Sequence, residues 1–298
     1  MRAMKIGDLA TAVPALRALA RAFPMHRRVL CAPEWLTPLV ALSGTIDEVV
    51  SVDDLGPRAA NLARCEVAVN LHGRGPESTE LLRELEPARL IAFGEPPQCV
   101  EWRDGEHERK RWCRLLSEHG IAADPNDMQM RPPRMRPPVT VDGATLVHPG
   151  ASSPARRWPA DRFAAVAREE LRQGRQVFIT GDDADRATAE AVAEGAGLSD
   201  DAILAGRTTL LELAATVAHA GRVCTNDTGV AHLATAFGTP SVVLFGPVPP
   251  SESGPPIGND RHIALWAGRR GDPHAADLDP GLARIRVDTV IDALSQLD

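Results

Sequence analysis

The sequence predicts an α/β protein with parallel sheets, and three observations support this. Short apolar runs typical of strands alternate with amphipathic helical runs along most of the chain. One proline-rich stretch, Met130–Gly143, interrupts the alternation and fits neither a helix nor a central strand. The length of 298 residues is sufficient for two domains of ordinary size. We therefore expect two doubly wound domains facing each other across a cleft, at residues 1–138 and 139–298.

The first half of the chain contains four expected strands and three expected helices. The strands are Arg28–Ala32, Glu48–Val52, Glu66–Leu71 and Arg89–Phe93. The helices are Thr11–Phe23, Glu34–Ser43 and Pro76–Leu85. Because strands and helices take turns, these elements are expected to form βαβ units with parallel strands.

The second half resumes the alternation after the proline-rich stretch. The expected strands are Thr145–His148, Gln176–Thr180, Ile203–Ala205, Arg222–Thr225 and Ser241–Phe245. The expected helices are Asp161–Arg172, Ala184–Ala193, Thr209–Ala220, Val230–Phe237 and Asp288–Leu297. Gly238 is the expected C-cap of the fourth of these helices. The last helix is amphipathic and is a candidate to pack back on the first domain.

Composition excludes several classes of protein. No apolar run is long enough to span a bilayer, and the N-terminus lacks the apolar region of a signal peptide, so a cytoplasmic protein is expected. The five cysteines are odd in number and scattered, which indicates reduced thiols and no disulfide framework or zinc site. The net charge of −7 argues against a nucleic-acid partner, which would require a basic face.

The stretch TNDTGVAHLATAFGTPSVVLFGP, Thr225–Pro247, places polar residues where a buried strand passes into a helix. The N–H groups at a helix N-terminus lack intrahelical partners and lie in the positive end of the helix dipole, so they can bind a phosphate. Gly229 lets the phosphate approach the main chain, and each charge-assisted bond contributes roughly 1.5–3 kcal/mol. The pattern fits equally well an N-cap at Asp227 and a core histidine at His232.

Three segments, in this order, resemble glycosyltransferase family 9, the heptosyltransferase family. The first is KIGD followed by TAVPALR, the second is HPGA followed by RRWP, and the third is DTGVAHLA followed by GTP and FGP. The resemblance implies a GT-B fold of two Rossmann-like domains, with the acceptor bound by the first and the nucleotide sugar by the second. It implies inverting transfer of a heptose-type sugar, from ADP-heptose, to a glycan or glycolipid hydroxyl. With such an acceptor, a peripheral contact of the protein with the inner face of the membrane is also an open possibility.

The resemblance also assigns roles to individual residues. Asp8 is the candidate general base, which must lie on the acceptor side, opposite the departing diphosphate, because inversion requires in-line attack by the acceptor oxygen. The competing interpretation is an N-terminal helix cap. Arg156 stands where the family usually has a phosphate-binding Lys, so a planar guanidinium replaces the compact ammonium group of Lys. Arg157 is the rival candidate for this phosphate contact. His72 follows a first-domain strand and is a candidate for acceptor binding, although a plain turn explains it as well.

The remaining donor contacts lie in loops that follow strands. Ser152 and Ser153 are candidates to bind the diphosphate together with Thr228 and Gly229. The candidates for the donor sugar and nucleotide are Asp227, His232 and Asp185. Asp182 and Asp183 are rivals of Asp185, and all three fit helix-start carboxylates.

Neither a metal nor a cofactor is expected. No D-x-D motif ends a first-domain strand, so stabilisation of the leaving group by Arg and the helix dipole is the favoured interpretation. Only Met1–Met4 precede Lys5, where the family has a full apolar strand. A misplaced start is the favoured explanation, because losing that central strand would expose two strand edges.

Two other functions remain open at this point. One is a GT-B-related nucleotide-sugar epimerase, which would require further acid and base groups beside Asp8. The other is an inactive paralogue that only binds a nucleotide sugar. Donor turnover measured with and without acceptor distinguishes these from a transferase.

Overall fold

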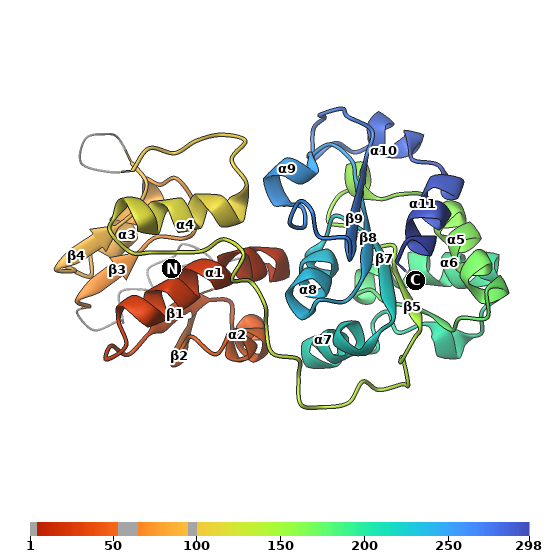
Figure 1. Cartoon of the computed structure of the whole chain (residues 1–298), viewed down its shortest axis with the longest axis horizontal. Coiled ribbons are helices and arrows are strands. Elements are labelled where there is room, and N and C mark those ends of the chain that lie inside the picture. The colour runs from red at the N-terminus through yellow and green to blue at the C-terminus, as the bar shows by residue number, and fades with distance from the viewer. Residues whose placement is uncertain (1–4, 53–64, 95–99, 298) are drawn as a thin grey trace. The chain divides into compact units, whose positions relative to one another are not determined.

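We describe the fold from a computed structural model that defines residues 5–52, 65–94 and 100–297. The chain divides into two compact units, Met1–Arg131 and Pro132–Asp298, whose elements are labelled in Figure 1. The boundary predicted after residue 138 falls in the same proline-rich stretch as this division. None of the helices in the described part of the chain is both long and apolar enough to cross a membrane.

The first unit contains two separate pairs of parallel strands. β1 (Val29–Ala32) pairs with β2 (Glu48–Ser51), and β3 (Val67–Val69) pairs with β4 (Arg89–Ile91). Its helices are α1 (Ile6–Ala22), α2 (Thr37–Ser43), α3 (Glu77–Arg83) and α4 (Glu108–Glu118), with a 3₁₀ turn η1 at Glu34–Leu36. All four expected strands are present in shortened form, but the described residues do not join them into one sheet.

The helix α1 begins five residues before the expected start at Thr11. The carboxylate of Asp8, in the first turn, accepts a hydrogen bond of 2.9 Å from the backbone N–H of Lys5. This bond satisfies one of the donors that a helix start leaves without a partner, so the helix extends back to Ile6.

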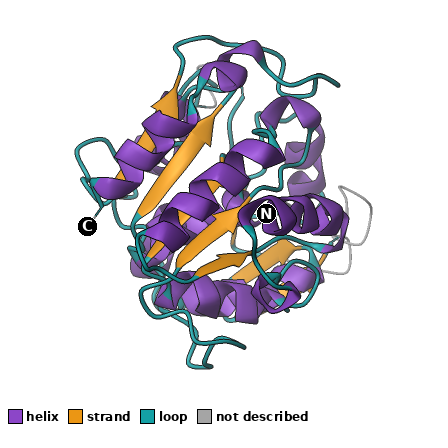
Figure 2. Ribbon diagram, turned by 90° about the vertical axis from the view of Figure 1, so that its right-hand side faces the viewer, coloured by secondary structure: helices purple, strands orange, loops and turns teal. Residues whose placement is uncertain are grey.

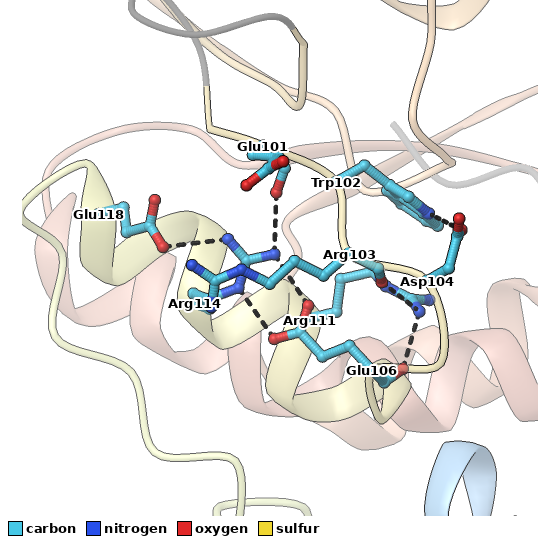
Figure 3. A network of polar contacts seen from close by, with 8 residues as sticks. All are labelled: Glu101, Trp102, Arg103, Asp104, Glu106, Arg111, Arg114 and Glu118. Atoms are coloured by element: carbon cyan, nitrogen blue, oxygen red, sulfur yellow. Dashed lines mark hydrogen bonds and ion pairs between the residues drawn. The ribbon is translucent and has the colours of Figure 1, made fainter.

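The helix α4 was not expected, because its charged residues mask a short apolar stripe that buries Trp112. A polar network fixes the preceding segment onto this helix (Figure 3). Arg114 binds Glu106 through two nitrogens, at 2.8 and 2.9 Å, and the guanidinium of Arg111 lies 4.2 Å from the ring centre of Trp102. Trp102 in turn packs edge-on against Trp112, so residues 101–106 are anchored by charge and by ring contacts.

The second unit contains one sheet of five parallel strands. They are β5 (Thr145–His148), β6 (Val177–Ile179), β7 (Arg222–Asn226), β8 (Ser241–Phe245) and β9 (His262–Trp266). Their order in the sheet is β6-β5-β7-β8-β9. The chain therefore moves one way from β5 to β6 and then crosses to the other side of β5 for β7. The direction of winding reverses between β5 and β7, which defines a topological switch point.

Helices cover both faces of this sheet, as Figure 2 shows. They are α5 (Ala160–Arg172), α6 (Arg186–Ala196), α7 (Leu210–His219), α8 (Gly229–Phe237), α9 (Pro250–Ser253), α10 (Pro280–Arg284) and α11 (Val287–Ser295). Short 3₁₀ turns are η3 (Pro154–Arg156), η4 (Asp183–Asp185) and η5 (Asp200–Ala202). Every residue of β7 and β8 is buried, as expected for strands of a parallel sheet with two covered faces.

The main core of the second unit lies between the sheet and α5, α6 and α11. Phe163 and Val192 from the first two helices meet Val290 and Leu294 from α11 there, and all four are fully buried. The last helix therefore buries its apolar face in the second unit, where it packs on α5 and β8. Gly238 ends α8 with a left-handed φ of 72°, which confirms its predicted role as the C-cap.

Some expected elements differ from the structure. The strand predicted at Ile203–Ala205 is reduced to a single bridge between Ile203 and Ile179, and β9 was not predicted. β9 lies at the edge of the sheet and is only partly buried, although four of its five residues, HIALW, are apolar. The cysteines Cys31, Cys65, Cys113 and Cys224 are free thiols, and Cys99 and Met1–Met4 lie outside the described residues.

Candidate functional site

The candidate site lies at the carboxyl ends of β5 and β7. These two strands are neighbours, with His148 opposite Thr225 in the register. The segment 149–159 follows β5, and Asp227 and Thr228 follow β7. Both predicted donor motifs therefore flank the switch point of the sheet, where open α/β sheets bind ligands.

The N-terminus of α8 offers main-chain donors at this position. Thr228 occupies the N-cap with extended backbone, φ −139° and ψ 177°, and its side chain does not cap the helix. Within the described chain, the N–H groups of Thr228 and Gly229 donate no hydrogen bond. The interpretation of Asp227 as the N-cap is wrong, because the cap position belongs to Thr228. The two N–H groups and the helix dipole can therefore hold an anion.

Arg156 is paired with Asp227. Its Nη2 donates to both Oδ2 and the backbone carbonyl of Asp227, each at 2.6 Å. The Asp227 side chain is 7% exposed, whereas that of Arg156 is 26% exposed. The Nε and Nη1 groups of Arg156 make no hydrogen bond to the residues described here, so the guanidinium is oriented by one nitrogen and keeps donors for a ligand.

The neighbouring Arg157 has different partners. Its Nε donates to the carbonyl of Ala151 at 2.9 Å, within the loop that follows β5. Its Nη2 lies 4.0 Å from the carboxylate of Asp185. The two rival arginines are thus separated by geometry, because only Arg156 contacts the turn that leads into α8.

Asn226, the last residue of β7, joins the two loops and was missed by the sequence analysis. Its side chain is fully buried, and its Nδ2 donates to the carbonyls of Pro149 and Gly150 at 2.9 and 3.2 Å. Its Oδ1 accepts the backbone N–H of Trp158 at 3.1 Å. The sequence signal that could have identified Asn226 is a polar residue at the end of a fully buried strand, because a buried amide requires hydrogen-bond partners.

Asp185 lies against the same loop, whereas its rivals Asp182 and Asp183 are exposed. A Cβ on Gly150 would lie 2.0 Å from Oδ2 of Asp185, so only glycine fits beside this carboxylate. Burial, followed by the charge of Asp182, raises the pKa of Asp185. The structure therefore brings Asp185 to the β5 loop, as a carboxylate tightly enclosed by main chain.

The two serines of the β5 loop differ in their environment. Ser153 is buried and its hydroxyl donates to the carbonyl of Pro273 at 2.6 Å. Ser152 is exposed and forms no hydrogen bond with the described residues. Of the two hydroxyls, that of Ser152 is available to a ligand without first breaking a protein contact.

Two histidines accompany the site. His232 lies half-buried in the first turn of α8. His148 ends β5 with its Nδ1 3.1 Å from the hydroxyl of Thr180. Burial lowers the pKa of His148 to about 4, so this imidazole is neutral near pH 7.

The first-domain candidates belong to the other unit. Lys5 occupies the N-cap of α1, and Asp8, the third residue of the helix, accepts the backbone N–H of Lys5, so its carboxylate takes part in capping this helix start. His72 follows β3, and its N–H donates to Oδ1 of the buried Asn70 at 3.0 Å, which forms a turn. The functional assignments of Asp8 and His72 stay predictions.

Within residues 5–52, 65–94 and 100–297, no group of three or more His, Cys, Asp or Glu side chains is arranged to hold a metal ion. A doubly wound sheet with an arginine and a helix N-terminus at its switch point is typical of α/β proteins that bind phosphorylated nucleotides. The sequence model of glycosyltransferase family 9 (heptosyltransferase) matches residues 106–276, more than half of the chain. The chain belongs to this family and is a glycosyltransferase.

Lipopolysaccharide heptosyltransferase 2 of Escherichia coli (strain K12) is 24% identical in an alignment of 312 positions that covers 90% of this chain and 88% of that protein. The glycosyltransferase family 9 structure from Veillonella parvula has a TM-score of 0.80 at 21% identity and covers 99% of this chain and 94% of that chain. The structure of E. coli ADP-heptose LPS heptosyltransferase II has a TM-score of 0.77 at 19% identity, with 99% and 96% covered. These likenesses confirm the α/β class and the GT-B fold.

A more distant likeness is to TibC from enterotoxigenic E. coli H10407, described as an iron-containing dodecameric glycosyltransferase. Its TM-score is 0.62 at 14% identity, and the alignment covers 99% of this chain and 76% of that chain. At this identity the similarity concerns the fold alone.

Proposed function

We propose that this protein transfers a heptose-type sugar from an ADP-sugar to a hydroxyl of a glycan or glycolipid, with inversion and without a metal ion. The observation that carries the proposal is the meeting of both donor motifs at the β5/β7 switch point. Family membership and the ADP-heptose named for the E. coli relative support the choice of donor.

In this proposal the donor diphosphate binds at the N-terminus of α8. The N–H groups of Thr228 and Gly229 donate to its oxygens, and the remaining donors of Arg156 neutralise part of its charge. The exposed hydroxyl of Ser152 can add a neutral contact. Asp185, His232 and Asp227 are proposed to set the position of the nucleotide and the sugar, with Asp227 acting through Arg156.

The proposed chemistry is a single displacement. The acceptor oxygen attacks the anomeric carbon as the bond from that carbon to the diphosphate oxygen breaks, and ADP leaves with the electron pair. The hydroxyl proton passes to the carboxylate of Asp8, which is proposed to act as the general base. His72 is proposed to bind the acceptor. Negative charge that develops on the leaving group is stabilised by Arg156 and the helix dipole.

A donor panel tests the proposal most directly. ADP-, UDP- and GDP-sugars are each incubated with the protein, with and without a lipopolysaccharide-type glycolipid acceptor, in the presence of EDTA. We expect ADP-heptose consumption that depends on acceptor and is unaffected by EDTA. Donor binding without consumption would instead support a binding protein, and acceptor-independent conversion of the sugar would support an epimerase.

A matched pair of variants tests the anion site itself. The larger side chain in Gly229→Val is expected to hinder the approach of the diphosphate. ADP binding is expected to weaken by at least about tenfold, which corresponds to the loss of one charge-assisted hydrogen bond. Gly73→Val, in the other unit at a glycine with open space around it and no left-handed φ, serves as the control for an added valine. Unchanged ADP affinity in a folded Gly229→Val protein would contradict the assigned site.

A further inference from the structure

His148 is a nearly buried residue beside the candidate site to which the proposed function gives no role. It is the last residue of β5 and is 8% exposed. Its Nδ1 lies 3.1 Å from the hydroxyl of Thr180, which directly follows β6. Its Nε2 forms no hydrogen bond with the described residues, and these residues do not close it off from solvent. One polar atom of an otherwise buried ring is therefore open to a ligand.

The side chain of His148 lies on the face of the sheet that α8 covers. The preceding residue, Val147, belongs to the core formed with α5, α6 and α11, and successive side chains of a strand point to opposite faces. Thr225 of β7 is opposite His148. Val243 of β8 is in turn opposite Thr225 and packs with Ala231 of α8. Figure 1 shows α8 on the other side of this sheet from α5, α6 and α11.

This position is one strand away from the proposed phosphate site. His148 and Thr225 are on neighbouring strands, which lie about 5 Å apart. The hydroxyl of Thr225 is 3.2 Å from the hydroxyl of Thr228, the N-cap of α8. A ligand whose diphosphate is held by the N–H groups of Thr228 and Gly229, and which extends from β7 across β5, therefore passes its next group over His148.

The imidazole suits a neutral polar group of the ligand. Burial lowers the pKa of His148 to about 4, so the ring carries no charge near pH 7. A neutral imidazole has one donor and one acceptor nitrogen, and Thr180 already engages Nδ1. A hydroxyl group both donates and accepts, so it fits Nε2 in either tautomer. A phosphate oxygen only accepts, and a neutral ring offers it no opposite charge.

The charges on the two sides of β5 indicate which hydroxyl this is. On the β7 side, Arg156 and the N-terminus of α8 favour phosphate. On the β6 side, Asp182 and Asp185 follow the strand, and carboxylates repel phosphate but accept hydrogen bonds from hydroxyl groups. A nucleotide that crosses from β7 to β6 therefore places its ribose over β5, because the ribose is the group joined to the diphosphate of ADP.

We propose that Nε2 of His148 binds a ribose hydroxyl of the donor nucleotide, which makes His148 a specificity-determining residue of the donor site. Thr180 holds the ring in the orientation that this contact requires. The protein then binds a ribonucleotide more tightly than the nucleotide that lacks the contacted hydroxyl. This inference rests on the proposed function, because it takes the diphosphate to bind at the N-terminus of α8.

Calorimetric titration of the full chain with ADP, 2′-deoxy-ADP and 3′-deoxy-ADP tests the inference. In wild type, loss of the contacted hydroxyl is expected to weaken binding about 3- to 10-fold, which corresponds to one neutral hydrogen bond. The amide of His148→Asn is too short to reach the position of Nε2. This variant is expected to bind ADP more weakly by the same factor and to bind ADP and the deoxy analogue equally. His148→Gln carries its amide one bond further out and is expected to restore part of the preference for ADP.

His262→Asn is the matched control. His262 is also a buried histidine of this sheet, and its Nδ1 lies 2.9 Å from the hydroxyl of Ser241, at the start of β8. Strands β8 and β9 begin at these two residues, so the control lies at the opposite edge of the sheet from the donor site. His262→Asn is therefore expected to keep the wild-type preference for ADP over each deoxy analogue.

The same preference for ADP in wild type and in His148→Asn would overturn the inference, as would equal binding of all three nucleotides by wild type. Failure of wild type to bind ADP would instead contradict the proposed donor site. If His148→Asn does not fold, NMR of nitrogen-15 histidine in the wild type replaces it, with the His148 signals assigned through His148→Gln. The Nε2 signal is expected to shift more with ADP than with the weaker analogue, and equal shifts at saturation would overturn the inference.

Discussion

Arg156 and Asp227 form a charge-assisted pair, with Nη2 2.6 Å from Oδ2, that links the loop after β5 to the turn after β7. Because Asp227 leads directly into Thr228 and Gly229, the pair fixes a cation beside the free N–H groups of α8. The nearly buried carboxylate is therefore a positioning group for the arginine, and an anion that binds at the helix meets a guanidinium already oriented.

The first prediction concerns the two arginines. Arg156→Ala removes a charge-assisted contact of roughly 1.5–3 kcal/mol, so the Kd for ADP is expected to rise about 10- to 100-fold. Arg156→Lys keeps the charge without the fork and is expected to fall between wild type and Arg156→Ala. Isothermal titration calorimetry with ADP measures both, and Arg157→Ala is the matched control, expected to bind within about twofold of wild type. A larger loss of ADP affinity in Arg157→Ala than in Arg156→Ala would assign the phosphate contact to Arg157 instead.

The second prediction concerns the packing of Gly150 against Asp185. A Cβ at position 150 would lie 2.0 Å from Oδ2, so Gly150→Ala is expected to lower the free energy of unfolding by about 1–3 kcal/mol. In an Asp185→Ala background the three atoms nearest to the added methyl group are absent. Urea unfolding of the four proteins of this double-mutant cycle is expected to show that most of the cost disappears there. An additive cycle would show that Asp185 does not cause the restriction at residue 150.

The fold and the motifs were predictable from the sequence to different degrees. The strands β5 and β8 have the predicted bounds, because a buried parallel strand appears as an uninterrupted apolar run between turn residues. The glycines and polar residues at the strand ends predicted the position of the site, because they interrupt these apolar runs. Partners distant in sequence were not predictable: Asn226 binds Gly150 across 76 positions, and nothing local specifies that pairing. The charged helix α4 was also missed, since its apolar stripe is narrow.

The third prediction is a pH effect from the buried imidazole of His148. Burial lowers its pKa in the folded protein to about 4, although the charge of Asp182 acts in the opposite direction. An ordinary histidine of the unfolded chain titrates near 6.5, so the unfolded state binds more protons between these values. Stability is therefore complete above about pH 6.5 and is lost as the pH falls towards 4.

The variant His148→Gln isolates this contribution, because glutamine retains polar groups near Thr180 and does not titrate. Wild type is expected to lose about 2 kcal/mol more than the variant between pH 7 and pH 5. Urea unfolding at both pH values gives the comparison. His262, whose pKa burial also lowers to about 4, is present in both proteins and so cancels. Parallel pH dependences of the two proteins would show that folding does not lower the pKa of His148.

The last prediction separates the two interpretations of Asp8. Its carboxylate accepts the N–H of Lys5, so Asp8→Ala is expected to cost about 0.5–2 kcal/mol of stability whether or not the residue is catalytic. The amide of Asp8→Asn still has an oxygen that can accept this hydrogen bond, but it cannot take the proton from the hydroxyl of the acceptor substrate. If Asp8 is the general base, Asp8→Asn keeps its stability and ADP affinity but has a kcat lowered by roughly 10²–10⁴. Transfer at saturating donor and acceptor measures this, with Tm recorded on the same samples. Wild-type turnover in Asp8→Asn would leave Asp8 as a capping residue alone, because the amide can replace the carboxylate only in that role.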